Sequence, residues 1–236
     1  WYAEAGVTLH LGRRVVAADP ALRTIRLDDG QSMGFEALVF ATGLAPRRLA
    51  VPGADLVGIH VLRTIADSRA IAAAAGPEAR VVVVGAGLLR LEIAAALRAR
   101  GASVTVLESA DRPLARVLPA VVADHVADLH ERRGVRVRCG VSVVAFVGTG
   151  RVRSVVLTDG SALSADLVVM AVGSTPNDAV AAAAGLDVRD GIVVDAGCRA
   201  SLPSICAIGD VARRRSARFG REWRLESWQN AQDQAA

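Results

Sequence analysis

The feature that most constrains the fold of this chain is an internal repeat. Residues 25–46 contain an Asp-Gly dipeptide, an apolar run, a glycine and a proline, and residues 155–176 contain the same features in the same order. The dipeptides end at Gly30 and Gly160, and Asp-Gly between apolar runs is typical of a hairpin turn. Because chance would rarely reproduce both blocks in order, we infer that the chain contains two versions of one α/β unit.

The second copy has an intact opening, which indicates the type of unit. An apolar run at 81–84 has the length of a buried parallel strand, and it is followed by a Gly-Ala-Gly loop at 85–87. A helical pattern then extends to about residue 100, and a second strand pattern covers 103–108. This order predicts a doubly wound nucleotide-binding unit. The first copy has no such opening, so we expect an N-terminal truncation of roughly 48 residues or more.

Composition argues against several other classes of protein. No apolar run reaches the roughly 18 residues that cross a bilayer, and no secretory signal is visible, so we expect a cytoplasmic protein without membrane contact. Aromatic residues make up 3% of the chain, too few for stacking on nucleic-acid bases. Cys139, Cys198 and Cys206 lack any CxxC or metal-ligand spacing. We interpret them as small buried thiols in a reducing compartment and expect no metal site.

The loop at 85–87 has most of a dinucleotide-binding fingerprint. In the pattern GxGxxG the first glycine makes a tight turn, and the second lets the backbone approach a pyrophosphate at the helix N-terminus. Gly85 and Gly87 hold these positions, and Glu108 ends the next strand. A carboxylate there accepts hydrogen bonds from the ribose hydroxyls and repels a 2′-phosphate, so the pattern favours NAD over NADP.

The third position of the fingerprint is Arg90 rather than glycine. A glycine there lets the helix pack closely on the strand, and we expect Arg90 to lie near the helix face that meets the sheet. The arginine therefore either extends outward or pushes the helix away, and displacement of the helix would weaken NADH binding. Alternatively, it adds a positive charge near the pyrophosphate. The sequence leaves these alternatives open.

Five motifs together resemble the FAD-dependent ferredoxin and rubredoxin reductases that supply electrons to oxygenases, within the wider group of flavoproteins with two dinucleotide-binding domains. The motifs are ATGLAPR at 41–47, VGAGLLRLE at 84–92, AVGSTPN at 171–177, IGDV at 208–211 and ESWQNAQ at 226–232. The last motif discriminates best, because relatives that reduce disulfides or nitrite differ there. The resemblance extends over essentially the whole chain.

The resemblance implies an α/β fold with two Rossmann-like units. An NAD-binding domain at 61–177 would be inserted in an FAD domain formed by 1–60 and 178–236. The implied cofactors are FAD and NADH, and the implied partner is an acidic ferredoxin or rubredoxin-type electron carrier. Because the flavin carries the chemistry, we expect no residue of the chain to act as a covalent catalyst.

The resemblance also implies individual cofactor contacts. For FAD they are Asp210 at the ribityl chain, Glu226, Ser227 and Trp228 near the isoalloxazine, Val15 at the adenine, and Thr42, Gly43 and Arg47 along the site. For NADH they are Gly85, Gly87, Leu88, Leu89, Glu92, Glu108 and Gly173. Two of these residues have structural alternatives, since Asp210 is also placed to cap a helix and Trp228 to pack in a core.

The arginines at 213–215, with Arg218 and Arg221, are either a solvated face or a docking site for an acidic ferredoxin. A formal net charge of +4 suits such a partner. Two other functions stay open for the chain. One is a disulfide reductase or NADH oxidase of related type, and the other is a non-catalytic nucleotide-binding module in which Arg90 marks a degenerate site.

Overall fold

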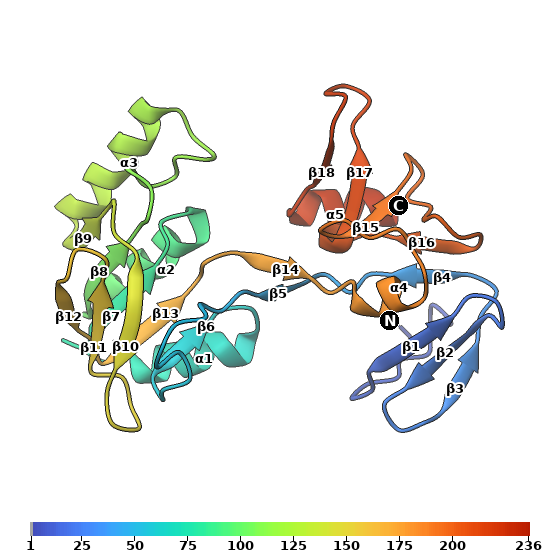
Figure 1. Cartoon of the computed structure of the whole chain (residues 1–236), viewed down its shortest axis with the longest axis horizontal. Coiled ribbons are helices and arrows are strands. Elements are labelled where there is room, and N and C mark those ends of the chain that lie inside the picture. Colours follow the sequence, from blue (N-terminus) through green and yellow to red (C-terminus); the bar gives the residue numbers. More distant parts are fainter. Residues whose placement is uncertain (1) are drawn as a thin grey trace. The chain divides into compact units, whose positions relative to one another are not determined.

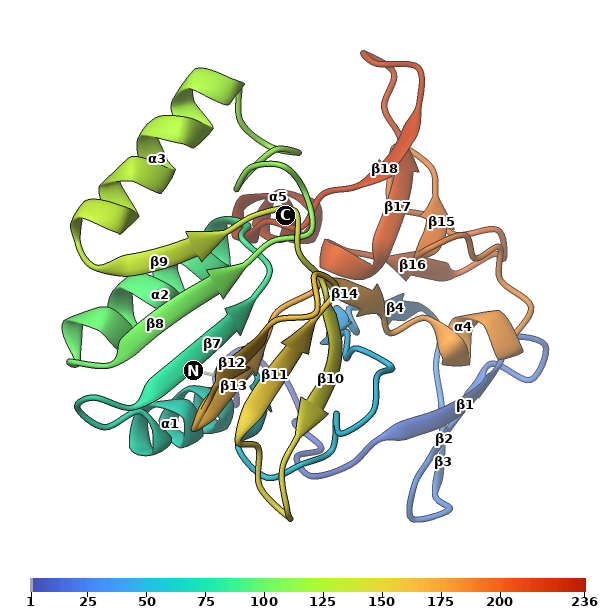
Figure 2. The same cartoon turned by 60° about the vertical axis from the view of Figure 1, so that its left-hand side comes forward.

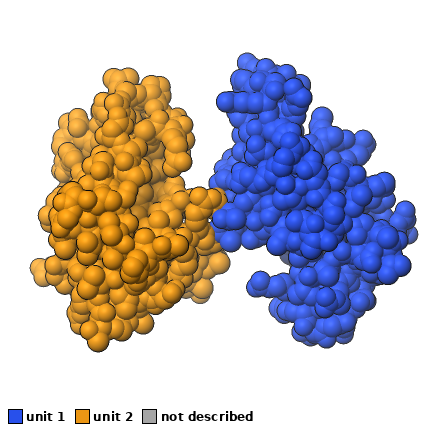
Figure 3. All heavy atoms as spheres, viewed as in Figure 1, with its two compact units in different colours: residues 1–45, 175–236 blue, residues 46–174 orange. Residues whose placement is uncertain are grey.

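The computed structural model describes residues 2–236, which form two compact units (Figure 3). Unit 1 comprises the described residues up to 45 together with residues 175–236, and unit 2 comprises residues 46–174. Each unit has its own hydrophobic core.

Unit 2 is built around a five-stranded parallel sheet with the strand order β6-β13-β7-β8-β9. Figure 2 shows β7, β8 and β9 running side by side with α2 and α3. The strands are β6 (Ile59–Val61), β7 (Arg80–Val84), β8 (Ser103–Leu107), β9 (Val135–Arg138) and β13 (Leu167–Met170). The helices that connect successive strands are α1 (Ile65–Ala74), α2 (Leu88–Ala99) and α3 (Ala120–Arg132). The predicted order of strand, loop, helix and strand is confirmed, and with it the Rossmann-like α/β class.

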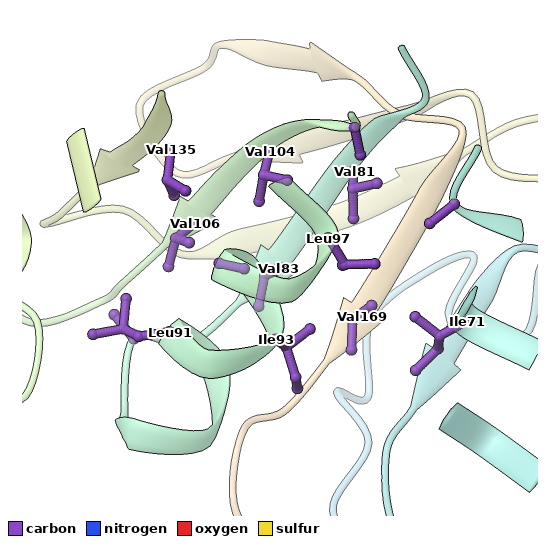
Figure 4. Close-up of a cluster of buried hydrophobic side chains, with 14 of the residues drawn as sticks. Ile71, Val81, Val83, Leu91, Ile93, Leu97, Val104, Val106, Val135 and Val169 are labelled. Carbon is purple, nitrogen blue, oxygen red and sulfur yellow. The ribbon is translucent and has the colours of Figure 1, made fainter. Parts of the chain in front are cut away.

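The central strand β7 is buried on both faces, which explains its continuous valine run. Val81 and Val83 belong to the core beneath the helices, where they meet Leu91 and Leu97 of α2 (Figure 4). Val82 and Val84 belong to a second core, which also contains side chains of an antiparallel sheet formed by β10 (Val143–Val147), β11 (Ser154–Leu157) and β12 (Ala162–Ser164). Unit 2 therefore has three layers, with the parallel sheet in the middle.

The repeat in the sequence folds as two similar antiparallel meanders. In unit 1 the strands are β1 (Val15–Asp19), β2 (Thr24–Leu27) and β3 (Ser32–Gly34), and in unit 2 they are β10 (Val143–Val147), β11 (Ser154–Leu157) and β12 (Ala162–Ser164). The first strand of each meander has a register shift at the corresponding place, between Val15 and Ala17 and between Val143 and Ala145. The two copies therefore share their strand register, including this irregularity.

The two Asp-Gly turns also have the same geometry. Gly30 and Gly160 take left-handed backbone conformations, with φ of 88° and 79°. Their N–H groups donate to the carbonyls of Leu27 and Leu157 at 3.1 and 3.0 Å. This conformation favours glycine, which explains why both copies carry it.

Unit 1 contains short strands and small helices (Figure 1). β4 (Leu38–Phe40) pairs in parallel with β16 (Ile205–Ala207), and β17 (Ala212–Arg215) lies between β15 (Ile192–Val194) and β18 (Glu222–Arg224). The helical elements are α4 (Ala179–Ala183), the single turn η1 (Gly209–Val211) and α5 (Trp228–Ala235). Where the chain passes between the units, β5 (Leu44–Pro46) pairs with β14 (Ser174–Pro176).

Residues 191–195 contribute a short apolar strand to the core of unit 1. Their strand, β15, pairs in parallel with β17, and only an isolated bridge joins Val188 to Ile192. The parallel pairing buries Ile192 completely, so the apolar side chains of this short strand are used in the core of unit 1.

The boundaries of the compact units differ from those of the predicted domains, which were 1–60, 61–177 and 178–236. Residues 46–60 belong to unit 2 because β6 is an edge strand of its parallel sheet. The preceding loop is also held there, since the N–H of Phe146 donates to the carbonyl of Pro52 at 2.9 Å. Among residues 2–236, no helix has the length and apolar character needed to cross a membrane.

Candidate functional site

The loop of unit 2 that carries the predicted fingerprint lies at the carboxyl end of β7. Gly85 has φ of 98°, and a Cβ atom there would lie 3.0 Å from the carbonyl oxygen of Ala171 on the neighbouring strand connection. Gly87 is the N-cap residue of α2, and no side chain caps this helix. Backbone N–H groups at a helix N-terminus point along the helix axis, so the loop presents them at the edge of the sheet where nucleotides bind in this type of fold.

Glu108 is fixed beside this loop. Its Oε2 accepts a hydrogen bond from the N–H of Ala86 at 2.7 Å, and its Oε1 accepts one from the N–H of Ala110 at 3.0 Å. The structure therefore brings together Gly85, Gly87 and Glu108, at the ends of the adjacent strands β7 and β8.

Of the alternatives for Arg90, displacement of α2 from the sheet does not occur in the structure. The Nε of Arg90 donates to the carbonyl of Ala171, and its Nη1 lies 2.6 Å from the position that a Cβ atom on Gly87 would take. The side chain therefore folds back over the glycine loop. The helix packs normally, with Leu91 and Ala94 buried to 3% and 0% exposure.

The other positions of unit 2 implied by the resemblance surround this loop or lie close to it in sequence. Leu88 and Leu89 are exposed in the first turn of α2, and Glu92 is exposed one turn later. Gly173 follows β13 with φ of 110°, and a Cβ atom there would have no heavy atom within 4 Å. Arg47 also belongs to unit 2, where its backbone N–H donates to the carbonyl of Gly173 at 2.9 Å.

A separate pocket of about 550 Å³ lies within unit 1. Five of the residues implied for FAD line it together, namely Gly43, Asp210, Glu226, Ser227 and Trp228. Trp228 is 75% exposed, so its indole is not packed in the core of unit 1. Asp210 lies inside η1, whose N-cap residue is Ile208, so it does not cap a helix either.

Hydrogen bonds from α5 hold two walls of this pocket together. Ser227 is the N-cap residue of α5, and its hydroxyl accepts from the N–H of Asn230 at 3.2 Å. Near the other end of the helix, Oε1 of Gln234 accepts from the N–H of Gly209 in η1 at 2.7 Å. The positions of Asp210 and Trp228 are therefore coupled through α5.

Thr42 and Val15 are not among the residues that line this pocket. The hydroxyl of Thr42 donates to the carbonyl of Asn177 at 2.7 Å, and the side-chain amide of Asn177 donates back to the carbonyl of Thr42 at 2.8 Å. These two hydrogen bonds join the two chain segments that lead out of unit 1. Val15 lies at the start of β1 and is 37% exposed.

Arg224 is a residue of the pocket region that sequence reasoning missed. Its side chain is 8% exposed, and its guanidinium pairs with Glu226 at 3.0 Å and with Asp190 at 3.4 Å. It also donates to the backbone carbonyl of Asp210 at 3.1 Å. Arg224 therefore positions two residues implied for the flavin site. The one feature of the sequence that could have indicated Arg224 is its position two residues before Glu226, and the many other arginines of the chain made this feature unspecific.

The sequence and the fold together match known proteins. Residues 2–235 match the family of pyridine nucleotide-disulphide oxidoreductases. The chain belongs to this family. It is 40% identical to the ferredoxin–NAD(+) reductase component of the biphenyl dioxygenase system from Paraburkholderia xenovorans (strain LB400), over 100% of the chain and 57% of that protein.

Two solved structures of reductases closely resemble this chain. A ferredoxin reductase from Rhodopseudomonas palustris has a TM-score of 0.95 and 42% identity, over 99% of the chain and 58% of that structure. The covalent putidaredoxin reductase–putidaredoxin complex has a TM-score of 0.96 and 36% identity over the same shares. The chain thus spans a little more than half the length of these relatives.

We expect Arg224→Ala to lower the free energy of unfolding of unit 1 by about 1–3 kcal/mol, because the carbonyl of Asp210 loses a charged donor and a buried side chain is removed. This decrease in the free energy of unfolding should be smaller than the decrease on breaking a fully buried ion pair, since the side chains of Asp190 and Glu226 are 59% and 46% exposed. Urea unfolding measures the change. Arg215→Ala, at an exposed position of β17, serves as the matched control, and equal midpoints for the two variants would show that Arg224 is not a positioning residue.

Proposed function

We propose that this protein is a flavoprotein reductase that uses FAD to pass electrons from NADH to a ferredoxin- or rubredoxin-type iron–sulfur protein. One observation carries the proposal: each of the two repeated units has its own candidate site, the loop with Glu108 in unit 2 and the pocket with Asp210 in unit 1. The similar proteins named as ferredoxin–NAD(+) reductases match along the entire chain, so both sites fall within the matched region.

The residues of unit 2 fit an NADH molecule. A Cβ atom on Gly87 would fill the space over the loop, and α2 has no side-chain cap to compete with a phosphate for its N–H groups. The carboxylate of Glu108, already held by two backbone donors, suits ribose hydroxyls and opposes a 2′-phosphate. Leu88, Leu89, Glu92 and Gly173 complete the proposed site.

The residues of unit 1 fit part of an FAD molecule. A pocket of about 550 Å³ has the size of a cofactor site, and it combines carboxylates at Asp210 and Glu226 with the exposed indole of Trp228. In the proposed arrangement Asp210 accepts hydrogen bonds from the ribityl hydroxyls, and Glu226, Ser227 and Trp228 lie beside the ring system. Val15, Thr42, Gly43 and Arg47 remain proposed FAD contacts.

Bound FAD would supply the redox chemistry, the uptake of an electron pair from NADH and the release of single electrons, while the protein would orient it and tune its potential. The chain itself therefore requires no nucleophile. Cys139 and Cys198 are poorly suited to that role, because burial raises the pKa of both thiols and so disfavours the reactive thiolate. This favours an iron–sulfur acceptor over disulfide reduction by these cysteines.

An acidic electron carrier suits the hairpin formed by β17 and β18. Arg215, Arg218 and Arg221 are exposed there, and Phe219 is 56% exposed with its ring 4.9 Å from that of Trp223. Arg213 and Arg224, by contrast, pair with carboxylates of unit 1. Arg213 and Arg224 therefore have a structural role. The exposed arginines at 215, 218 and 221 are available to a negatively charged partner.

We expect the protein to bind NADH more tightly than NADPH, and Glu108→Ala to narrow this preference by about tenfold, because the carboxylate no longer repels a 2′-phosphate. Calorimetric titration of both nucleotides into both proteins measures the preference. Asp124→Ala, which removes an exposed carboxylate from α3 of the same unit, controls for general charge effects. Equal affinity of the unmodified protein for the two nucleotides would contradict the assignment.

The function is tested by adding NADH to the FAD-loaded protein in the presence of an acidic ferredoxin and following the iron–sulfur absorbance. We expect reduction of the ferredoxin, slowed about tenfold or more at low salt by Arg218→Glu combined with Arg221→Glu. The matched control combines Arg14→Glu with Arg26→Glu, at two exposed positions of the β1–β3 meander. It makes the same change in net charge and should leave the rate of ferredoxin reduction unchanged. NADH oxidation without ferredoxin reduction would refute the function, and equal rates for the two double variants would refute docking at the hairpin.

A further inference from the structure

The guanidinium of Arg90 lies inside the candidate NADH site rather than at its margin. Its Nε donates to the carbonyl of Ala171, which follows β13, and its Nη1 lies 2.6 Å from the position of a Cβ atom built on Gly87. A Cβ atom on Gly85 would lie 3.4 Å from Nε of the same side chain. The arginine therefore covers both glycines of the loop.

The space that it takes is the space that the fingerprint keeps open. Gly87 occupies the second glycine position, where the missing side chain lets a pyrophosphate approach the backbone. Nη1 stands where that side chain would begin, so a phosphate group and the guanidinium exclude each other. We propose that Arg90 closes the dinucleotide crevice of unit 2 and that NADH binds only by displacing its side chain; this inference rests on the proposed NADH site.

The local electrostatics make this closed arrangement displaceable. A cation near a helix N-terminus faces the positive end of the helix dipole, which is unfavourable. The hydrogen bond to Ala171 opposes this effect and holds the side chain in place. The neighbouring Leu88 and Leu89 are 58% and 44% exposed, so the side chain of Arg90 can move from the loop into solvent without displacing buried residues.

The contact that Arg90 loses on displacement, compared with the one that it gains, decides whether it strengthens or weakens NADH binding. Leaving the crevice costs a hydrogen bond from a charged donor, worth roughly ten- to a hundredfold in an equilibrium constant. At the exposed rim the guanidinium recovers at most about fivefold through an ion pair with the bound phosphates. Arg90 therefore weakens dinucleotide binding, although its charge is opposite to that of the ligand.

The test is calorimetric titration of NADH, and of ADP-ribose as a pyrophosphate ligand without nicotinamide, into the unmodified protein and three variants. Arg90→Gly restores the glycine, and Arg90→Ala removes the guanidinium while keeping helix propensity in case the glycine variant folds poorly. Arg98→Ala removes an arginine from the last turn of the same helix and is the control. We expect both Arg90 variants to bind both ligands roughly tenfold more tightly, and the control to bind like the unmodified protein.

Two results would overturn the inference while leaving the NADH site intact. Weaker binding by Arg90→Ala, with a shallower dependence on salt, would show that Arg90 is a phosphate ligand. Equal binding by the unmodified protein and Arg90→Ala would show that the guanidinium does not compete with the nucleotide. Binding by none of the proteins would overturn both the inference and the proposed use of NADH.

Discussion

The parallel pairing of β7 with β13 on one side and β8 on the other is the interaction on which the rest of unit 2 depends. It joins residues that are far apart in the sequence and aligns their carboxyl ends at one edge of the sheet. Gly85, Glu108 and Ala171 each follow one of these strands, so the loop, the carboxylate and the carbonyl that holds Arg90 meet there. A shift of register in either pairing would separate them.

Each unit has a candidate site near the end of an equivalent strand, and the two candidate sites differ in how they are completed. Gly43 and Gly173 follow the equivalent strands β4 and β13, and both have left-handed backbones, with φ of 61° and 110°. In unit 2 the adjoining parallel strands supply the glycine loop and Glu108. In unit 1 the pocket beside Gly43 is completed by η1 and α5, which follow the second copy of the repeat in the sequence. One fold thus offers two candidate sites that are lined by different residues.

Much of this architecture was predictable because it depends on local chemistry. The Asp-Gly turns, the valine run of β7 and the order of glycines in the loop each depend on a backbone requirement that only certain residues meet. The pairing of β15 with β17 was not predictable, because a short apolar strand carries no sign of its partner. The transfer of residues 46–60 to unit 2 depends in the same way on the tertiary pairing of β6.

Arg90 and Arg224 show the same limit of prediction from the sequence. The anomaly at Arg90 was visible as a break in a motif, whereas the path of its side chain to Ala171 depends on a neighbouring strand and needed the structure. Arg224 broke no motif, and its burial among Asp190, Asp210 and Glu226 arises only when β18 folds beside η1. Charge and composition indicated many arginines without showing which of them are structural.

The central claim is that the edge of the sheet at β7 and β8 is a dinucleotide site. Mapping backbone amide resonances during titration with ADP-ribose tests it most directly. The account predicts shifts at Ala86, Leu88, Leu89 and Ala110, with the β10–β12 meander and the pocket of unit 1 unaffected. Shifts confined to the unit 1 pocket, or an unchanged loop at saturating ligand, would contradict it.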